Sequence, residues 1–298
     1  MAMDEETREK YIEAGRIARE AREIAVETAE PGTPLLDIAE AAEEYIRAEG
    51  AETAFPVNLS IDDDAAHYTP SRGDDAVFEE GQLLNIDVGA QVDGYIGDTA
   101  VTVDPAGDHA ELVAASADAL DAALELVEPG VTLGEIGAAI QDAIESRGFT
   151  PVRNLSGHGL DRYTQHTGKT VPNIDTGSDE ELEAGEAVAI EPFATDGAGT
   201  VKDGRPGNIY KLEDGNARGR TERKVLGEVK DRFRTLPFTD RWLESVPPAR
   251  VTAAIRNLVR SGNLHAYDVL TESDGGMVSQ KEHTVIVAEN PVVTTRES

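Results

Sequence analysis

Four carboxylates stand in short segments that are otherwise apolar, and this feature constrains the fold more than any other. Asp87 lies in Leu-Leu-Asn-Ile-Asp-Val-Gly, Asp98 in Tyr-Ile-Gly-Asp-Thr-Ala-Val, Glu191 in Ala-Val-Ala-Ile-Glu-Pro-Phe, and Glu282 directly precedes His-Thr-Val-Ile-Val. Short apolar runs of this kind predict buried strands. Because burial of an unpaired carboxylate costs several kcal/mol, the fold must bring these four groups to cations.

A divalent metal is the cation that the neighbouring sequence favours. Lys and Arg are nearly absent from the four segments, and without any Cys the ligands must be His and carboxylate. His158, in Ser-Gly-His-Gly, adds a candidate imidazole. Asp87 and Asp98 flank a predicted turn at Asp93-Gly94, and strand pairing can bring both to one point. Such a set suits Mn, Fe, Co or Zn, and two bridged ions activate water for attack on a carbonyl.

Helical and strand patterns follow one another in blocks and predict an α+β fold. Helical spacing of apolar residues predicts helices over 4–29, 34–50, 110–126 and 133–147, the last with a capping box of Thr132 and Glu135. Thr33 is the expected N-cap of the second helix, with Pro34 at its first position. Strands are expected over 83–88, 95–103, 264–270 and 282–288. A block rich in Arg, Lys and Glu begins near residue 218 and predicts a small inserted helical subdomain.

The charge of the chain excludes some partners. Of 298 residues, 58 are Asp or Glu and 27 are Lys or Arg, which gives a net charge of −31. Direct binding of nucleic acid is not expected from this sum, because phosphate binding requires a basic surface. The acids are spread along the whole chain, which predicts the cytoplasmic protein of a halophile, folded where molar salt screens the repulsion. The charged segment 1–10 is not a signal peptide, and no apolar run reaches membrane length.

The order and spacing of seven short motifs resemble those of the methionine aminopeptidases. The motifs are Phe55–Ser60, Ala65–Pro70, Ile86–Gly89, Asp98–Ala100, Asn154–His158, Ile190–Phe193 and Glu282–Thr284. The block between Glu191 and Glu282 is similar to the insert of the type II subclass of archaea and eukaryotes. The resemblance implies the pseudo-symmetric pita-bread fold, with residues 1–212 and 264–298 as the catalytic domain and 213–263 as the inserted helical subdomain.

The resemblance also implies site residues and a reaction. Two divalent metal ions would be held by Asp87, Asp98, His158, Glu191 and Glu282, with Asp98 and Glu282 bridging. His67 and His166 would contact the scissile amide and the tetrahedral intermediate, and Glu191 would also move the proton of the attacking water. Phe55, Tyr267 and Leu270 would line the pocket for the methionine side chain. Taken alone, His67 could be a structural hydrogen-bond donor, and Phe55 and Tyr267 could be core aromatics.

The resemblance implies that the substrates are N-termini of nascent polypeptides whose second residue is small, and it raises the ribosome as a partner. The nearest rival is a peptidase of the same fold that cuts before proline, or a creatinase-like hydrolase. Such relatives carry a further His four residues before the metal His, where this chain has Asn154. A second rival is a non-catalytic module of this fold, but such modules have lost metal ligands and this chain keeps all five.

Overall fold

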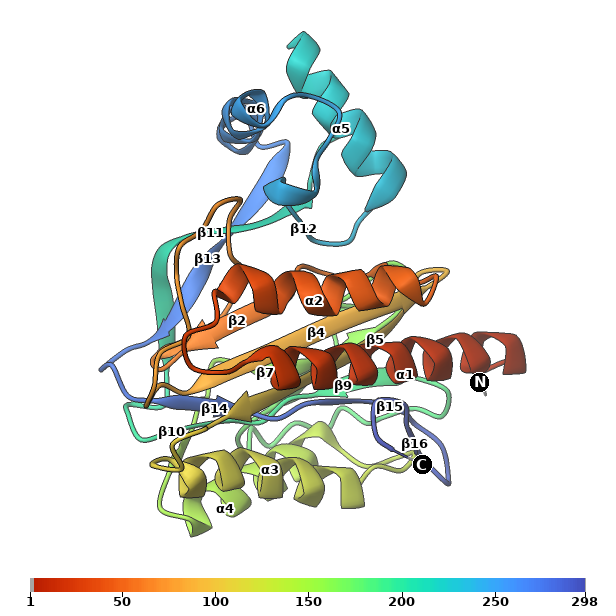
Figure 1. The fold of residues 1–298 in the computed structure, drawn as a ribbon. Coiled ribbons are helices and arrows are strands. Elements are labelled where there is room, and N and C mark those ends of the chain that lie inside the picture. Colours follow the sequence, from red (N-terminus) through yellow and green to blue (C-terminus); the bar gives the residue numbers. More distant parts are fainter. Residues whose placement is uncertain (1–2, 298) are drawn as a thin grey trace.

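Two pairs of helices enclose antiparallel strands, and a smaller helical lobe projects from one side (Figure 1). The structure, a computed structural model, describes residues 3–297. Its helices are α1 (Glu5–Thr28), α2 (Leu35–Ala48), α3 (Ala110–Glu125), α4 (Leu133–Ser146), α5 (Arg220–Arg232) and α6 (Pro248–Arg260), with a 3-10 turn η1 (Asp240–Trp242). None of the helices in this described part combines the length and apolar character needed to cross a bilayer.

The strands form four small sheets. They are β1 (Glu52–Thr53), β2 (Asn58–Ile61), β3 (Asp64–Ala66), β4 (Leu84–Val92), β5 (Tyr95–Val103), β6 (Thr150–Pro151), β7 (Ser156–Leu160), β8 (Thr170–Pro172), β9 (Ala187–Ile190), β10 (Phe193–Thr195), β11 (Val201–Leu212), β12 (Phe238–Thr239), β13 (Leu264–Glu272), β14 (Val278–Gln280), β15 (His283–Ile286) and β16 (Val292–Val293). The strand orders are β1-β4-β2 with β5 on β4, β14-β10-β6, β12-β11-β13-β3, and β16-β15-β9-β7-β8.

The N-termini of α1 and α4 have side-chain caps, whereas the N-terminus of α2 does not. The Asp4 side chain caps α1 by accepting from the Thr7 backbone N–H at 3.0 Å, and Thr132 and Glu135 form the predicted capping box of α4. The expected N-cap Thr33 is wrong, because Pro34 takes that position. The Thr33 carbonyl instead accepts from the backbone N–H of Phe78, so this segment pairs with a neighbouring loop.

The hairpin of β4 and β5 confirms the predicted pairing and fixes two of the carboxylates. Asp87 lies opposite Ala100, and Asp98 lies opposite Gly89. Because side chains alternate across a strand, Asp87 and Asp98 are diagonal neighbours on one face of the hairpin. The expectation that strand pairing gathers these two side chains is met by this register.

Two hydrophobic cores hold the helix pairs against the strands. Ile17 of α1 and Ile38 of α2 pack with Ile86 of β4, and α3 and α4 form a second core with β9 and β15. The C-terminal segment crosses the first helix at close range. A Cβ atom added to Gly15 would lie 2.4 Å from the carbonyl oxygen of Thr294, so only glycine allows this approach.

The projecting lobe has a hydrophobic core of its own. Val225, Leu226 and Val229 of α5 pack with Phe238 and Trp242, and with the inner face of α6. Leu264 of β13 and Tyr210 of β11 also join this core. The lobe therefore shares its base with the long β11–β13 ribbon, and a domain boundary at 213 and 263 stays a prediction.

Candidate active site

A cavity of about 370 Å³ lies between the sheets and collects every residue that the sequence predicted for the site. It is lined by Asp87, Asp98, His158, Glu191, Glu282, His67, His166, Phe55, Tyr267 and Leu270. These residues come from segments spread over most of the chain. The fold therefore assembles one polar centre and one apolar wall around a single space.

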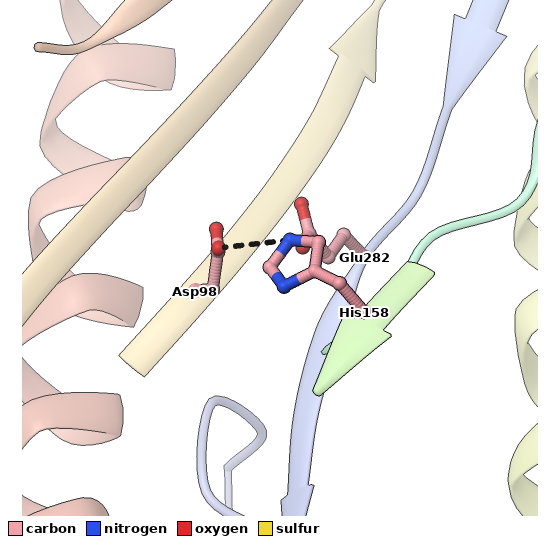
Figure 2. A group of neighbouring side chains, drawn as sticks. All are labelled: Asp98, His158 and Glu282. Atoms are coloured by element: carbon pink, nitrogen blue, oxygen red, sulfur yellow. Dashed lines mark ion pairs between the residues drawn. The ribbon is translucent and has the colours of Figure 1, made fainter. Parts of the chain in front are cut away.

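Asp98, His158 and Glu282 form the tightest group in this cavity (Figure 2). Asp98 stands on β5, His158 on β7, and Glu282 lies between β14 and β15, with one ligand atom of each residue within 4.8 Å of the others. The His158 Nε2 atom is 3.7 Å from Asp98 Oδ2 and 3.6 Å from Glu191 Oε1. Asp87 lines the same space from β4.

Paired threonines fix the segments that carry Asp98 and Glu282. The Thr284 hydroxyl accepts from the Asp98 backbone N–H at 2.8 Å and donates to the Asp98 carbonyl oxygen at 2.9 Å. The Thr99 hydroxyl donates to the Glu282 carbonyl oxygen at 2.9 Å. These contacts hold both carboxylates in place without using their own oxygens.

Four carboxyl groups are buried together in the cavity, and a cation would offset their negative charge. Burial raises the pKa of Asp98 to about 7 and raises the pKa of Asp87, Glu191 and Glu282 well above the usual range, and repulsion among the carboxylates adds to the latter three. In residues 3–297, His158 supplies the only basic nitrogen within 4.0 Å of these oxygens. Burial lowers the pKa of His158 to about 3, so the ring is neutral at pH 7 and does not offset the negative charge.

A metal fits this donor set. The Asp87 Oδ1 and His158 Nδ1 atoms are buried and have no hydrogen-bond partner in the described part of the chain. A polar atom is rarely buried without a hydrogen-bond partner unless an ion or a water molecule binds to it. Oxygen ligands with one imidazole are a set that divalent transition metals accept.

The two other histidines flank the polar centre. The His166 ring lies 4.2 Å from the His158 ring, centroid to centroid, and the His67 ring lies 5.1 Å from Tyr267. Burial lowers the pKa of both rings, and Lys211 lowers that of His166 further, so both are neutral N–H donors at pH 7. His67 has a φ of 67°, a conformation that a non-glycine residue adopts at some energetic cost.

The other end of the cavity is apolar. Phe55, Leu270 and Tyr267 line it together with Ile209 of β11 and Pro237 of the lobe. A Cβ atom on Gly89 would lie 2.2 Å from the Phe55 ring, so this glycine, two residues after Asp87 in β4, makes room for the aromatic wall. The resulting wall can receive a long unbranched apolar side chain.

Sequence reasoning missed a glutamine that orients two of the acidic side chains. The Gln280 amide donates to Glu191 Oε2 at 3.0 Å and to Glu282 Oε2 at 3.3 Å, and the Asn85 amide in turn donates to Gln280. A signal was present, because Gln280 stands two residues before Glu282. Asn58, opposite Asp87 in the β2–β4 register, also lines the cavity and was missed.

A buried ion pair ties the lobe to the loops that carry the site. Glu43 of α2 pairs with both terminal nitrogens of Arg241 in η1, and its Oε2 accepts from the Trp242 indole N–H at 2.8 Å. The Val57 backbone N–H also donates to Glu43, at 3.3 Å, and Arg241 donates to the Pro70 carbonyl oxygen at 3.2 Å. One carboxylate thus connects the lobe with the segments next to Phe55 and His67.

The chain is similar to known proteins over nearly its whole length. Residues 9–289 match the profile of metallopeptidase family M24. The chain belongs to family M24. It is 48% identical to the methionine aminopeptidase of Archaeoglobus fulgidus over 294 residues, which cover 98% of this chain and 99% of that protein. It is 45% identical to the methionine aminopeptidase of Methanocaldococcus jannaschii, over 99% of this chain and 100% of that protein.

The fold is shared with a more distant solved structure. The methionine aminopeptidase of Thermotoga maritima superposes with a TM-score of 0.73 at 23% identity, over 100% of this chain and 99% of the other. The pita-bread architecture expected from the sequence is therefore confirmed, as is the resemblance that led to it.

Proposed function

We propose that this M24 chain is a metal-dependent aminopeptidase that removes the N-terminal methionine of nascent polypeptides whose second residue is small. The observation that carries the proposal is that a cluster of buried carboxylates and an apolar wall line the same cavity. The similarity to archaeal methionine aminopeptidases over nearly the whole chain supports the same reaction.

We assign the role of metal ligand to Asp87, Asp98, His158, Glu191 and Glu282, which together would hold two divalent ions. A bound divalent cation supplies Lewis-acid polarisation of a peptide carbonyl and makes water nucleophilic at neutral pH. The Co, Mn, Fe and Zn ions are the candidates, since each accepts carboxylate and imidazole together.

Residues of the chain supply the remaining chemistry. Glu191 is assigned the role of accepting a proton from the attacking water and passing it to the leaving amine. The neutral rings of His166 and His67 donate hydrogen bonds to the oxygen that gains negative charge and to the scissile amide. Phe55, Tyr267 and Leu270 hold the methionine side chain, so the first peptide bond lies at the polar centre.

Peptide cleavage tests this function directly. Protein freed of metal with a chelator is supplied with Mn, Co, Fe or Zn in molar KCl, and release of the first residue is measured from Met-Ala-Ser, Met-Lys-Ser and Ala-Ala-Ser. Rapid release from Met-Ala-Ser alone is expected, because the apolar wall selects methionine and a large second side chain meets the cavity edge. Equal or faster release of the first residue from Met-Lys-Ser or Ala-Ala-Ser would contradict the proposal.

The proposed substrates place this chain near newly made polypeptides. Association with the ribosome stays a prediction.

A further inference from the structure

A second, smaller chamber opens beside the candidate active site. It has a volume of about 200 Å³ and shares His166, Pro237 and Tyr267 with the wall of the main cavity. Lys211, Thr235 and the segment 163–165 complete its lining. The residues that the chamber does not share with the main cavity have no part in the reaction proposed above. The chamber therefore extends the space around the cavity to side chains whose role is still open.

The chamber contains a lysine without an acidic partner. Two lysines line the main cavity and the chamber. Lys169, in the main cavity, lies 2.8 Å from Glu186 and 3.8 Å from Glu180. Lys211, in the chamber, has no carboxylate within 4.0 Å among residues 3–297, and Glu213, two residues later, is exposed. In a chain with 58 acidic residues, a half-buried ammonium without a carboxylate is unexpected, because nothing offsets its partial loss of solvation.

The ribbon of β11 and β13 sets the distance from the apolar wall to this lysine. In the register of the ribbon, Ile209 lies opposite Tyr267, and Lys211 lies opposite His265. Because side chains alternate along a strand, Ile209 and Lys211 share one side of β11, and Tyr267 and His265 share one side of β13. The pair with Lys211 is two residues, or about 7 Å, farther along the ribbon than the pair with Ile209.

The pair of Lys211 and His265 lies on the solvent side of the apolar wall. His265 is exposed, and its ring centroid lies 4.6 Å from that of Tyr267. The Tyr267 ring in turn lies 5.1 Å from the ring of His67, which flanks the polar centre. Three rings thus follow one another from the polar centre to the surface, and Lys211 stands beside the outermost of them.

An extended peptide substrate has the same repeat as the ribbon. Its first and third side chains point to one side and are about 7 Å apart. When the methionine side chain lies against Ile209 and Tyr267, the third side chain lies level with Lys211. The second side chain points the opposite way, toward the cavity edge, which agrees with the small second residue of the proposed function.

We propose that the chamber beside His166 is the subsite for the third residue of the substrate, and that Lys211 selects an acidic side chain there. The inference rests on the proposed function, since it places methionine on the apolar wall. The carboxylate of Asp or Glu pairs with the ammonium through a charge-assisted hydrogen bond. A basic third residue is repelled by the same ammonium, and an apolar one covers it without supplying an acceptor.

Cleavage of three peptides with amidated C-termini, Met-Ala-Glu-Ser, Met-Ala-Gln-Ser and Met-Ala-Lys-Ser, tests the proposal. Gln has the shape of Glu without its charge, and the amide removes the terminal carboxylate, which could otherwise take the same place. The metal-loaded full-length protein is assayed at the lowest KCl concentration at which circular dichroism shows it folded, because salt screens the ion pair. We expect kcat/KM to be at least about threefold higher for the Glu peptide than for the Gln peptide, and lowest for the Lys peptide.

Variants of Lys211 separate its charge from its packing. In Lys211→Gln the ratio of kcat/KM between the Glu and Gln peptides should fall to about 1, and in Lys211→Glu the Lys peptide should become the best of the three. Lys211→Arg keeps the cation and should keep most of the preference. The control Lys202→Glu makes the same change of charge near the other end of β11, where the ammonium is exposed and donates to the Ser273 carbonyl oxygen at 2.8 Å. It should keep the ratio of the unmodified protein.

Equal kcat/KM for the Glu and Gln peptides in the unmodified protein would overturn the subsite. So would a preference for Glu that persists in Lys211→Glu, or one that is lost equally in Lys202→Glu. Each of these results includes release of methionine and leaves the proposed function standing. No release of methionine from any of the three peptides would instead contradict the proposed function, and the subsite with it.

Discussion

His158 and His166 are neighbours, but their surroundings give them different roles. His158 is buried between carboxylates, whereas His166 lies at the cavity edge. We therefore expect His166→Ala to keep bound metal and to lower kcat roughly 10²-fold or more, since a donor to the developing oxyanion is lost. Metal content by mass spectrometry and kcat on Met-Ala-Ser measure the two effects separately.

The matched variant is His158→Ala, which is expected to lose metal and activity together because a ligand is removed. Loss of metal in His166→Ala would place that residue among the ligands instead.

The substitution Glu282→Gln should raise the thermal unfolding midpoint under some conditions and lower it under others, because Glu282 belongs to the buried acidic cluster. Burial and neighbouring carboxylates raise the pKa of Glu282. A carboxyl whose pKa is raised by folding contributes stability below its unfolded pKa and loses it as pH rises through the folded pKa. In chelator at pH 8, Glu282→Gln should therefore raise the thermal unfolding midpoint, because the amide removes the cost of burying or protonating the carboxylate.

At pH 3, below the pKa of the carboxyl in both the folded and the unfolded states, that gain should vanish. With metal at pH 8 the same substitution should lower the midpoint, because a ligand is missing. A midpoint that falls under all three conditions would show that Glu282 stabilises the fold by packing alone.

At the scale of elements, Glu43 and Arg241 connect the lobe to α2. Glu43→Gln leaves a buried guanidinium without its carboxylate, and we expect a loss of about 3–5 kcal/mol in the free energy of unfolding. The variant Glu43→Leu/Arg241→Met removes both charges and should recover most of that loss. Denaturant unfolding measures the free energy of unfolding of each variant. The chain has one tryptophan, Trp242, which donates to Glu43, so its fluorescence reports on this contact.

Equal stability of Glu43→Gln and the unmodified protein would show that the Arg241 charge is solvated. Comparison of the fluorescence and circular dichroism transitions shows whether the lobe separates before the sheets unfold.

Elements with regular patterns could be predicted from the sequence, and those held by distant partners could not. The β4–β5 hairpin follows from its alternating apolar residues and its Asp93-Gly94 turn. The strand β11 was missed because its segment Lys202–Gly207 contains glycine, proline and charges, and because β11 pairs with β13 through two register shifts. The role of Glu43 was hidden since its partner Arg241 lies 198 residues away. The gathering of the four buried carboxylates in one cavity could be predicted, because a carboxylate in an apolar strand is costly wherever its partners lie.

At the scale of the whole molecule, charge and metal act together on stability. The net charge of −31 opposes compaction, and this repulsion weakens as the Debye length falls from about 10 Å at 0.1 M to about 3 Å at 1 M salt. Metal bound by the native state alone adds about 2.7 kcal/mol at a concentration one hundred times its Kd. We expect the lowest unfolding midpoint in low KCl with chelator, and a higher one when either KCl or metal is added.

Thermal unfolding across KCl concentrations, with and without chelator, measures both contributions. A midpoint independent of KCl would show that the acidic surface is no adaptation to salt, and it would leave the peptidase function untouched.

The packing of Thr294 on Gly15 has a consequence for how each copy of the protein is made. The helix α1 can pack on Thr294 only when that residue has been synthesised, and the Asp98 backbone can bond to Thr284 only 186 residues after Asp98 itself is made. Pairings this distant in sequence form slowly and late. A growing chain therefore lacks a complete proposed site until residues 282–294 have been synthesised, and a copy is expected to have no activity before that point.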